Sequence, residues 1–432
     1  MNLASLRRAI GAGAWAVTDQ ALFAGANFTL NVLLARWLGD SGYGVFAVAY
    51  AVFLFVSLTF TALIIDPLLI YGAGRWRRSF SLYLRRVLVG LGALSLVGAT
   101  LLLVASRLAF LLDGTGALRP VLVTLAWAGP IILLQWTLRR SLYAVGKPKL
   151  AAAGGAIYFA MLMTATLLAK ELWEITAERA MAAMALASLI AAAFLWKMIA
   201  AEKGSAPPPG QEPATRRVYS SHWQYGRWIL AGYVLDWLGG DVLYLVLAPA
   251  HGPEAVGAFR AAMTLTLPAM HTLVALSSVA VPWFVSKAGT GAFRRAITAY
   301  WVGTTALAAG YCLLLVAFAE TIIRLVYGEV FSGLAQIVRT VAFIPLAVAT
   351  QATMGTALRA IERTRGLFYG AAATAALTAT VGIWLATQHG APGAARAALF
   401  AAVLNAVALT WMARRAIEVD AKPIADSVQV DA

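Results

Sequence analysis

The chain has 432 residues, of which 61% are hydrophobic and only 12% charged, and its mean hydropathy is +0.77. A soluble domain of this length needs far more charge to cover its surface, so the composition excludes a soluble globular protein. The formal net charge of +15 is collected in short segments between apolar runs, which the positive-inside rule explains without a nucleic-acid partner.

Apolar runs long enough to cross a bilayer core of about 30 Å follow one another along the whole chain. The first run follows a basic segment but has no signal-peptide cleavage site, so we expect it to be retained as a span. We expect membrane-spanning helices near residues 11–35, 43–71, 85–106, 119–142, 150–170, 180–200, 226–248, 255–285, 295–319, 334–358, 366–388 and 393–414. The sequence therefore predicts an all-α polytopic membrane protein with about 12 transmembrane helices.

Basic residues occupy alternate gaps between these runs. About 25 of the 34 Lys and Arg residues fall on the side that holds both termini, and about 9 fall on the other side. Because cytoplasmic loops carry the excess of positive charge, we expect both termini to be cytoplasmic.

The sequence predicts two six-helix lobes joined by a linker. Residues 203–217 contain Pro207-Pro208-Pro209 and separate an N-terminal lobe, 1–202, from a C-terminal lobe, 218–415, which a flexible cytoplasmic tail follows at 416–432. A shift of 213 positions aligns one segment of each lobe, pairing Leu34 with Leu247, Ala35 with Ala248, Gly39 with Gly252, Gly44 with Gly257, Phe46 with Phe259 and Ala49 with Ala262. This repeat predicts two pseudo-symmetric bundles in the same orientation.

The second span of each lobe is too long for the hydrocarbon core and carries a proline near its cytoplasmic end, Pro67 or Pro282. We expect these spans to tilt, bend or project from the membrane, and Pro268 to add a further bend. Asp66-Pro67 is either part of a gate or the cap of a bend.

Intramembrane polar residues are the candidate site, because each costs free energy in lipid and tends to face a cavity or a partner. Gln20, Asn27 and Asn31 share one face of the first span, and Asp19 borders that face. They either line a cavity for a polar substrate, with Asp19 as a site for a coupling ion, or join helices by hydrogen bonds.

Asp236 and Asp241 of the seventh span are further candidates for the coupling ion. They point to different sides of a regular helix, but Gly239-Gly240 between them permits an unwound turn. Each aspartate is either a proton or sodium site or a structural partner of a neighbouring arginine.

Arginines near helix ends are the candidates for binding a phosphate or pyrophosphate group. Arg260 lies about one turn inside the eighth span and Arg36 ends the first. For Arg36, Arg139, Arg140 and Arg359 the alternative is that the side chain reaches the lipid headgroups.

The sequence does not favour an enzyme or a metal protein. It has no Asp-x-Asp signature, no Walker or Ser-His-acid constellation and no long extracytoplasmic loop. Its four histidines are far apart, and Cys312 is the only cysteine. We expect no resident metal or cofactor.

The stretch ANFTLNVLLARWLGDSGYGVFAVAYAV, residues 26–52, resembles the opening of oligosaccharide flippases, the polysaccharide-transporter branch of the superfamily that also contains multidrug and toxic-compound extruders and lipid II flippases. In that family a Leu-Leu-Ala-Arg-x-Leu-Gly-like segment ends the first span and a Gly-(Tyr/Phe)-Gly-x-(Phe/Tyr) turn opens the second. The match is carried by Leu33, Leu34, Ala35, Arg36, Leu38, Gly39, Tyr43, Gly44 and Phe46.

The resemblance implies a multidrug-and-toxin-extrusion-like fold and a flippase of the bacterial inner membrane. Such a protein moves a polyprenyl-pyrophosphate-linked oligosaccharide to the outer leaflet by alternating access, for surface polysaccharides such as exopolysaccharide or O-antigen. It works among membrane lipids alongside a polysaccharide polymerase and glycosyltransferases. Two alternatives remain open: an ion-coupled multidrug exporter of the same fold, and a non-transporting scaffold of a polysaccharide assembly complex.

Overall fold

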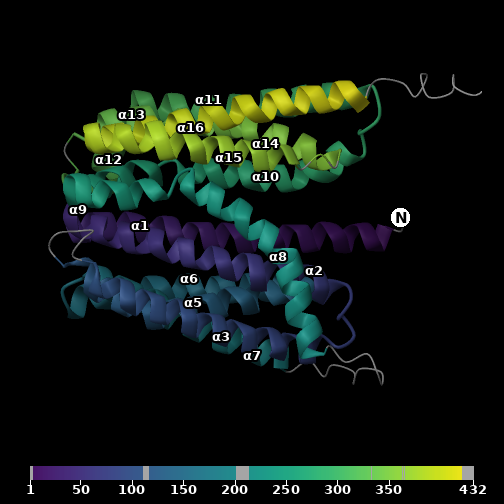
Figure 1. The fold of residues 1–432 in the computed structure, drawn as a ribbon, viewed down its shortest axis with the longest axis horizontal. Helices are drawn as coiled ribbons and strands as arrows, with labels where there is room; N and C mark the ends of the chain where they lie inside the picture. Colours follow the sequence, from purple (N-terminus) through teal and green to yellow (C-terminus); the bar gives the residue numbers. More distant parts are fainter. Residues whose placement is uncertain are drawn as a thin grey trace, which may run out of the picture. The chain divides into compact units, whose positions relative to one another are not determined.

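The computed structural model describes residues 3–109, 116–200, 214–331, 333–361, 363 and 365–420, with side chains from residue 14 onward except 278, 279, 282 and 418–420. Every regular element within these ranges is a helix. The chain forms two compact units (Figure 1): unit 1 comprises Met1–Val234 and Leu247–Arg260, and unit 2 comprises Leu235–Val246 and Ala261–Ala432.

Unit 1 contains the helices of the first half and the beginning of the second. In chain order they are α1 (Leu3–Phe60), the π-helix η1 (Thr61–Ile65), α2 (Asp66–Ala73), α3 (Phe80–Arg107), α5 (Leu118–Ala144), α6 (Pro148–Leu172), α7 (Ala177–Ala200), α8 (Thr215–Leu238) up to Val234, and part of α9 (Val242–Thr264). Helix α5 packs on α7, α3 and α1, while α6 packs on α1 and α7.

Unit 2 contains the rest of α8 and α9 and all later helices. These are α10 (Leu267–Val285), α11 (Ala292–Ala317), α12 (Ala319–Tyr327), α13 (Ala335–Val341), α14 (Ile344–Ala360), α15 (Arg365–Leu377), the π-helix η2 (Thr378–Gly382) and α16 (Ile383–Asp420). Helix α14 packs on α10, α11 and α16.

Nine helical runs within the described residues are long and apolar enough to cross a membrane, and three of them are 50 to 60 residues long. At 1.5 Å per residue each of those three would measure at least about 75 Å, far more than one bilayer core. Each contains one glycine with positive φ where two helices meet: Gly39, Gly252 or Gly390. Figure 1 shows the second part of α1 running back alongside the first. Divided at these glycines, and with the short segment after Gly252 continued by α10, the runs give the twelve spans that the sequence predicts.

Large apolar side chains lie on the outer faces of these helices. On α3 the exposed fractions reach 67% for Val89, 71% for Leu96 and 63% for Leu101. Water would not tolerate so much contiguous apolar surface, whereas lipid chains cover it at no cost. The chain is therefore a multi-pass membrane protein.

The two glycine turns of the predicted repeat adopt the same backbone conformation. Gly39 has φ 70° and ψ −177°, and Gly252 has φ 78° and ψ 170°. Only glycine visits this region without strain. The 213-residue shift that pairs these positions in the sequence therefore also pairs them in the structure.

The helices that follow these turns touch each other through the repeated glycines. A Cβ atom on Gly44 would lie 1.7 Å from the carbonyl oxygen of Pro253, and one on Gly257 would lie 2.1 Å from that of Asp40. The shift maps Asp40 onto Pro253 and Gly44 onto Gly257, so the contact is reciprocal. The two copies of the segment meet inside unit 1 around a local pseudo-two-fold axis.

Contacts group the chain differently from the predicted lobes. Most of α8 and Leu247–Arg260 follow the predicted linker in sequence but lie in unit 1. Residues 203–213 of that linker and 421–432 of the predicted tail are outside the described ranges, and α16 continues to Asp420. The division into lobes 1–202 and 218–415 stays a prediction.

The predicted irregularities of the long second spans correspond to breaks in the helices. The π-helix η1 directly precedes Asp66 and Pro67, which open α2. In the second half, the turn at Leu265 and Thr266 separates α9 from α10, whose second residue is Pro268. Pro282 lies within α10, and its side chain is outside the described part.

Candidate functional site

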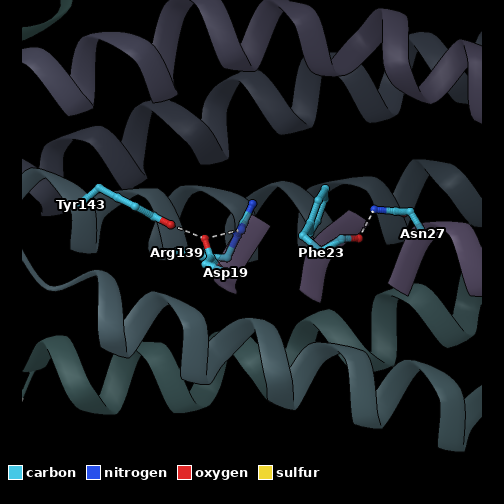
Figure 2. A network of polar contacts seen from close by, with 5 residues as sticks. All are labelled: Asp19, Phe23, Asn27, Arg139 and Tyr143. Carbon is cyan, nitrogen blue, oxygen red and sulfur yellow. Dashed lines mark hydrogen bonds and ion pairs between the residues drawn. The ribbon is translucent and has the colours of Figure 1, made fainter. Parts of the chain in front are cut away.

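The most deeply buried charges described in unit 1 form an ion pair between α1 and α5 (Figure 2). Arg139 Nη1 lies 2.7 Å from Asp19 Oδ2, and the Tyr143 hydroxyl donates to the same oxygen at 2.5 Å. The side chains of Asp19 and Arg139 are only 1% and 3% exposed. The Arg139 guanidinium also lies 4.5 Å from the ring centroid of Phe23, one turn along α1. Asp19 is thus enclosed by one cation and one hydroxyl.

One face of α5 carries a stripe of polar side chains that supplies both partners of Asp19. Gln135, Arg139 and Tyr143 are spaced four residues apart, so they lie on one face of the helix. Gly155 lets α6 approach the other side of Asp19, since a Cβ atom there would lie 2.9 Å from Asp19 Oδ1. Three helices therefore enclose one carboxylate in the membrane interior.

Several buried polar atoms around the stripe have no hydrogen-bond partner within the described part of the chain. They are Asp19 Oδ1, Arg139 Nε, the Trp136 indole nitrogen and both amide atoms of Gln135. Buried polar groups are normally satisfied, and leaving one unpaired costs about 1 to 3 kcal/mol. The stripe therefore offers donors and acceptors to a proton, a water molecule or a polar ligand.

A second polar cluster joins α1 to α9 inside unit 1. Asn31 Oδ1 accepts from the Tyr43 hydroxyl at 2.9 Å and from Arg260 Nε at 3.2 Å, which uses both lone pairs of that oxygen. The half-buried Arg260 guanidinium lies 5.0 Å from the ring centroid of Tyr50. The structure brings together Asn31 and Arg260, two predicted cavity residues 229 positions apart.

A chain of aromatic contacts links the two clusters. Tyr50 packs on Phe53 with ring centroids 5.9 Å apart, and Phe53 packs edge-on against Trp136 at 5.6 Å. Trp136 contacts Phe23 at 5.7 Å, and Arg139 lies over Phe23. Rings in such contacts fix one another's orientation. A continuous series of packed aromatic rings therefore connects the Arg260 guanidinium to that of Arg139.

The other residues of the first span that were predicted to line a cavity differ from one another in burial and in hydrogen bonding. Asn27 is half-buried and donates to the Phe23 carbonyl at 2.9 Å, as Asn31 does to the Asn27 carbonyl at 2.8 Å. Gln20 is half-buried, and Arg36 is exposed at the end of its helix. The shared face of the amides is thus partly used for bonds within α1 itself.

The predicted gate at Asp66-Pro67 is a contact between η1, α2 and α8. Tyr233 donates to Asp66 Oδ2 at 2.8 Å. Pro67 has no N–H, so the Leu63 carbonyl four residues earlier loses its helical partner. His222 Nδ1 lies 2.7 Å from that carbonyl oxygen, and its Nε2 lies 2.7 Å from the Tyr83 hydroxyl. This geometry assigns the proton to Nδ1 and makes Tyr83 the donor to Nε2.

Gly226 completes the contact of α8 with η1. A Cβ atom on Gly226 would lie 2.3 Å from the Ala62 carbonyl oxygen. This is the other carbonyl that Pro67 leaves without a partner in a π-helical pattern. Helix α8 therefore docks where the proline has opened the helix.

The predicted unwound turn between Asp236 and Asp241 is present. Helix α8 ends at Leu238 and α9 begins at Val242, with turns from Gly239 to Asp241. Within unit 2, Thr378 of η2 donates to the Gly239 carbonyl at 2.9 Å. Asp236 is exposed and Asp241 is half-buried. The break removes the constraint that a continuous helix would place on the relative directions of the two side chains.

Arg139 is the clearest correction to the sequence analysis, which offered headgroup contact as its alternative role. It is buried and paired with Asp19, whereas Arg359 is exposed. Gln135, Tyr143 and His222 were not singled out at all. The four-residue spacing of Gln135, Arg139 and Tyr143 was the signal that could have revealed the stripe.

No group of three or more His, Cys, Asp or Glu side chains that could hold a metal ion occurs in the described ranges. The donor set of the two clusters, with amides, guanidinium groups and phenols, suits anions and hydroxyls better than a cation.

No protein-family model and no curated protein matches the chain. Among solved structures, it is similar to a multidrug resistance MATE family transporter of the MOP superfamily in its inward-facing conformation, with a TM-score of 0.75 and 14% identity over 93% of this chain and 95% of that one. The lipid II flippase MurJ in an inward closed conformation gives a TM-score of 0.71 and 15% identity over 94% of this chain and 87% of that one.

A MOP superfamily transporter from Pyrococcus furiosus gives a TM-score of 0.67 and 13% identity over 96% of both chains. All three structures are named as transporters or a flippase, and none as an enzyme. At such identities the likeness establishes the fold, which confirms the predicted fold class: this chain is a multi-pass helical membrane protein with the fold of MATE transporters and MurJ.

Proposed function

We propose that this protein is a flippase that moves a polyprenyl-pyrophosphate-linked oligosaccharide from the cytoplasmic to the outer leaflet of a bacterial inner membrane, with both termini in the cytoplasm. The fold shared with transporters and a lipid flippase supports a transport function, and residues 26–52 favour the oligosaccharide branch. The observation that carries the proposal is Arg260, a half-buried guanidinium within a membrane span, held by Asn31 and Tyr50.

The physical demand on a flippase is to carry a charged, hydroxyl-rich head group past hydrocarbon. Moving such a group into lipid without partners costs many kcal/mol. A guanidinium fork forms charge-assisted hydrogen bonds to a pyrophosphate, and amides such as Asn27 and Gln20 suit sugar hydroxyls. The isoprenoid tail can stay in the bilayer throughout, since it is as apolar as the lipid.

An ion gradient drives transport in this proposal, because the sequence has no nucleotide-binding signature. Of the three candidate carboxylates, Asp236 is exposed beside a helix break, whereas Asp19 is held by Arg139 and Tyr143. Asp236 therefore binds and releases the coupling proton or sodium ion, with Asp241 as the second candidate. The product would feed a polysaccharide polymerase, and glycosyltransferases would supply the substrate.

The test is reconstitution with a fluorescent polyprenyl-pyrophosphate disaccharide in both leaflets of sealed vesicles, with a proton or sodium gradient imposed across the membrane. Dithionite bleaches only the outer leaflet, so active protein raises the bleached fraction from about half to nearly all. We expect Arg260→Gln to slow this exchange about tenfold or more, the size expected for losing a charge-assisted hydrogen bond. The matched control is Arg339→Gln, because Arg339 forms an exposed ion pair with Glu320. A wild-type rate in Arg260→Gln would refute the assigned role.

The second candidate is an ion-coupled multidrug exporter. It is favoured by the exposed Asp236 and by the similarity in fold to multidrug MATE transporters. Vesicles with an imposed proton or sodium gradient separate the two functions: an exporter accumulates a cationic dye and loses this activity in Asp236→Asn. A flippase leaves the dye outside and exchanges the lipid-linked sugar.

A further inference from the structure

Unit 2 carries a long groove between α11, α14 and α16. It consists of two adjoining hollows of about 490 and 800 Å³ that share Thr350, Thr410 and Arg414 in their lining. Volumes of this size match those of small-molecule sites. Helices α11, α14 and α16 belong to candidate membrane spans, and Val403, Val407 and Trp411 of the lining are exposed, so we place the groove on the lipid-facing surface.

The smaller hollow is a cationic mouth. Arg294 and Arg414 both line it and are both exposed, and Thr298, Thr350 and Thr410 surround them. Trp301 is fixed in its wall by a 3.0 Å hydrogen bond to Thr350 Oγ1. Among the described lining residues there is no carboxylate to neutralise the two arginines. Two arginines that line the same hollow suit a phosphate group.

The larger hollow continues this mouth as an apolar trough. Its lining includes Phe343, Leu346, Leu399, Val403 and Trp411. Phe343 and Trp411 are 46% and 54% exposed on the membrane-facing surface. A hydrocarbon chain would lie in such a trough, whereas a free sugar or nucleotide would leave its polar groups unpaired there.

We propose that this groove binds one anionic glycerophospholipid of the cytoplasmic leaflet, with its phosphate between Arg294 and Arg414 and an acyl chain in the trough. The mouth lies at the end of the spans that holds Lys287, Arg295 and Arg359, which the positive-inside rule assigns to the cytoplasm. Basic pockets between spans on this side attract anionic headgroups. This site is separate from Arg260 and does not depend on the transported substrate.

An apolar groove in unit 1 shows why the arginines matter. That hollow, about 700 Å³ between α5, α6 and α7, is lined by one cation, Arg179. Arg179 donates to the backbone carbonyl of Glu174, and Glu178 is its neighbour in sequence. We therefore expect ordinary lipid chains to fill the groove of unit 1 without selection for a charged headgroup.

The test compares retention of phosphatidylglycerol and phosphatidylcholine of equal chain length by the purified full chain, measured by native mass spectrometry. Arg294→Gln/Arg414→Gln removes the cationic mouth. Arg295→Gln/Arg359→Gln removes two exposed arginines of the same basic end that do not line the groove. Both double variants change the net charge equally.

We expect wild type and the Arg295/Arg359 variant to retain phosphatidylglycerol over phosphatidylcholine, and the Arg294/Arg414 variant to lose this preference about tenfold or more. In addition, brominated phosphatidylglycerol should quench part of the tryptophan fluorescence, and Trp301→Phe/Trp411→Phe should remove that part. Equal retention of the two lipids by wild type, or an unchanged preference in Arg294→Gln/Arg414→Gln, would overturn the proposal.

Discussion

The interiors of the two units are held together by different chemistry. Unit 1 buries an ion pair, Asp19 with Arg139, and a histidine that joins two helices. In the described part of unit 2, neutral side chains meet in the interior: Thr304 lies 3.4 Å from Thr353, and Asn405 donates to Gln351 at 3.4 Å.

The ion pairs within the described residues of unit 2 lie on the surface instead. Arg324 and Glu329 are 74% and 89% exposed, and the Arg339–Glu320 pair is also exposed. Both copies of the repeated turn, at Gly39 and Gly252, also lie in unit 1. The free-energy cost of disturbing charge should therefore be concentrated in unit 1.

The largest effect should come from breaking the buried ion pair. Arg139→Gln leaves the Asp19 carboxylate without a counter-charge in an apolar interior, which typically costs about 3 to 5 kcal/mol of stability. We expect a large loss of monodisperse protein after the variant is heated in detergent, measured by size-exclusion chromatography. Arg119→Gln, an exposed arginine at the other end of α5, should behave as wild type.

The double variant Asp19→Asn/Arg139→Gln sharpens this comparison, because it removes both charges and leaves two neutral amides. It should recover more than half of the lost stability. If the double variant is no more stable than Arg139→Gln, the unpaired charge of Asp19 is not the cause of the lost stability.

A smaller effect should follow from His222→Phe, which keeps an aromatic ring but leaves the Leu63 carbonyl without its donor and the Tyr83 hydroxyl with only the Pro67 carbonyl, 3.4 Å away. Leaving such a group unpaired costs about 1 to 3 kcal/mol of stability. We expect a lower midpoint of thermal unfolding. The same change at His389, an exposed histidine of unit 2, serves as the control.

Pro67→Ala tests the cause of this effect. It restores a backbone N–H to the helix, so the Leu63 carbonyl no longer depends on His222. His222→Phe should therefore cost less in the Pro67→Ala background than in wild type. Equal costs in the two backgrounds would argue against the proline as the origin of the contact.

The smallest effect should be found on the surface of unit 2. Arg324→Gln and Arg339→Gln each remove an exposed ion pair, and such pairs contribute only about 0 to 1 kcal/mol. We expect unfolding midpoints within one or two degrees of wild type. A fall as large as that of His222→Phe would mean that charge is as important in unit 2 as in unit 1.

The elements predicted from the sequence are those governed by local rules. Apolar length located the twelve spans, and the 213-residue repeat located the turns at Gly39 and Gly252. The pair Gly239-Gly240 predicted the break between α8 and α9. In each case one residue type has a backbone or solvation preference strong enough to act without knowledge of distant partners.

The candidate site was predicted only in part, because its contacts join distant segments. Asn31 and Arg260 were both chosen as polar residues within spans, but the sequence does not say that they touch. Asp19 is separated from Arg139 by 120 positions, and its partner depends on how α1 packs on α5. His222 was missed because its role depends on a carbonyl that Pro67 leaves unpaired 159 positions away.

The composition of unit 1 has a consequence for biosynthesis. When the ribosome has released only the first six spans, the Leu63 carbonyl still lacks His222, and the helix after Gly39 still lacks its close contact with Gly257. The Leu63 carbonyl gains this partner only when α8 emerges from the translocon. The packing of the first half therefore depends on sequence that is translated later.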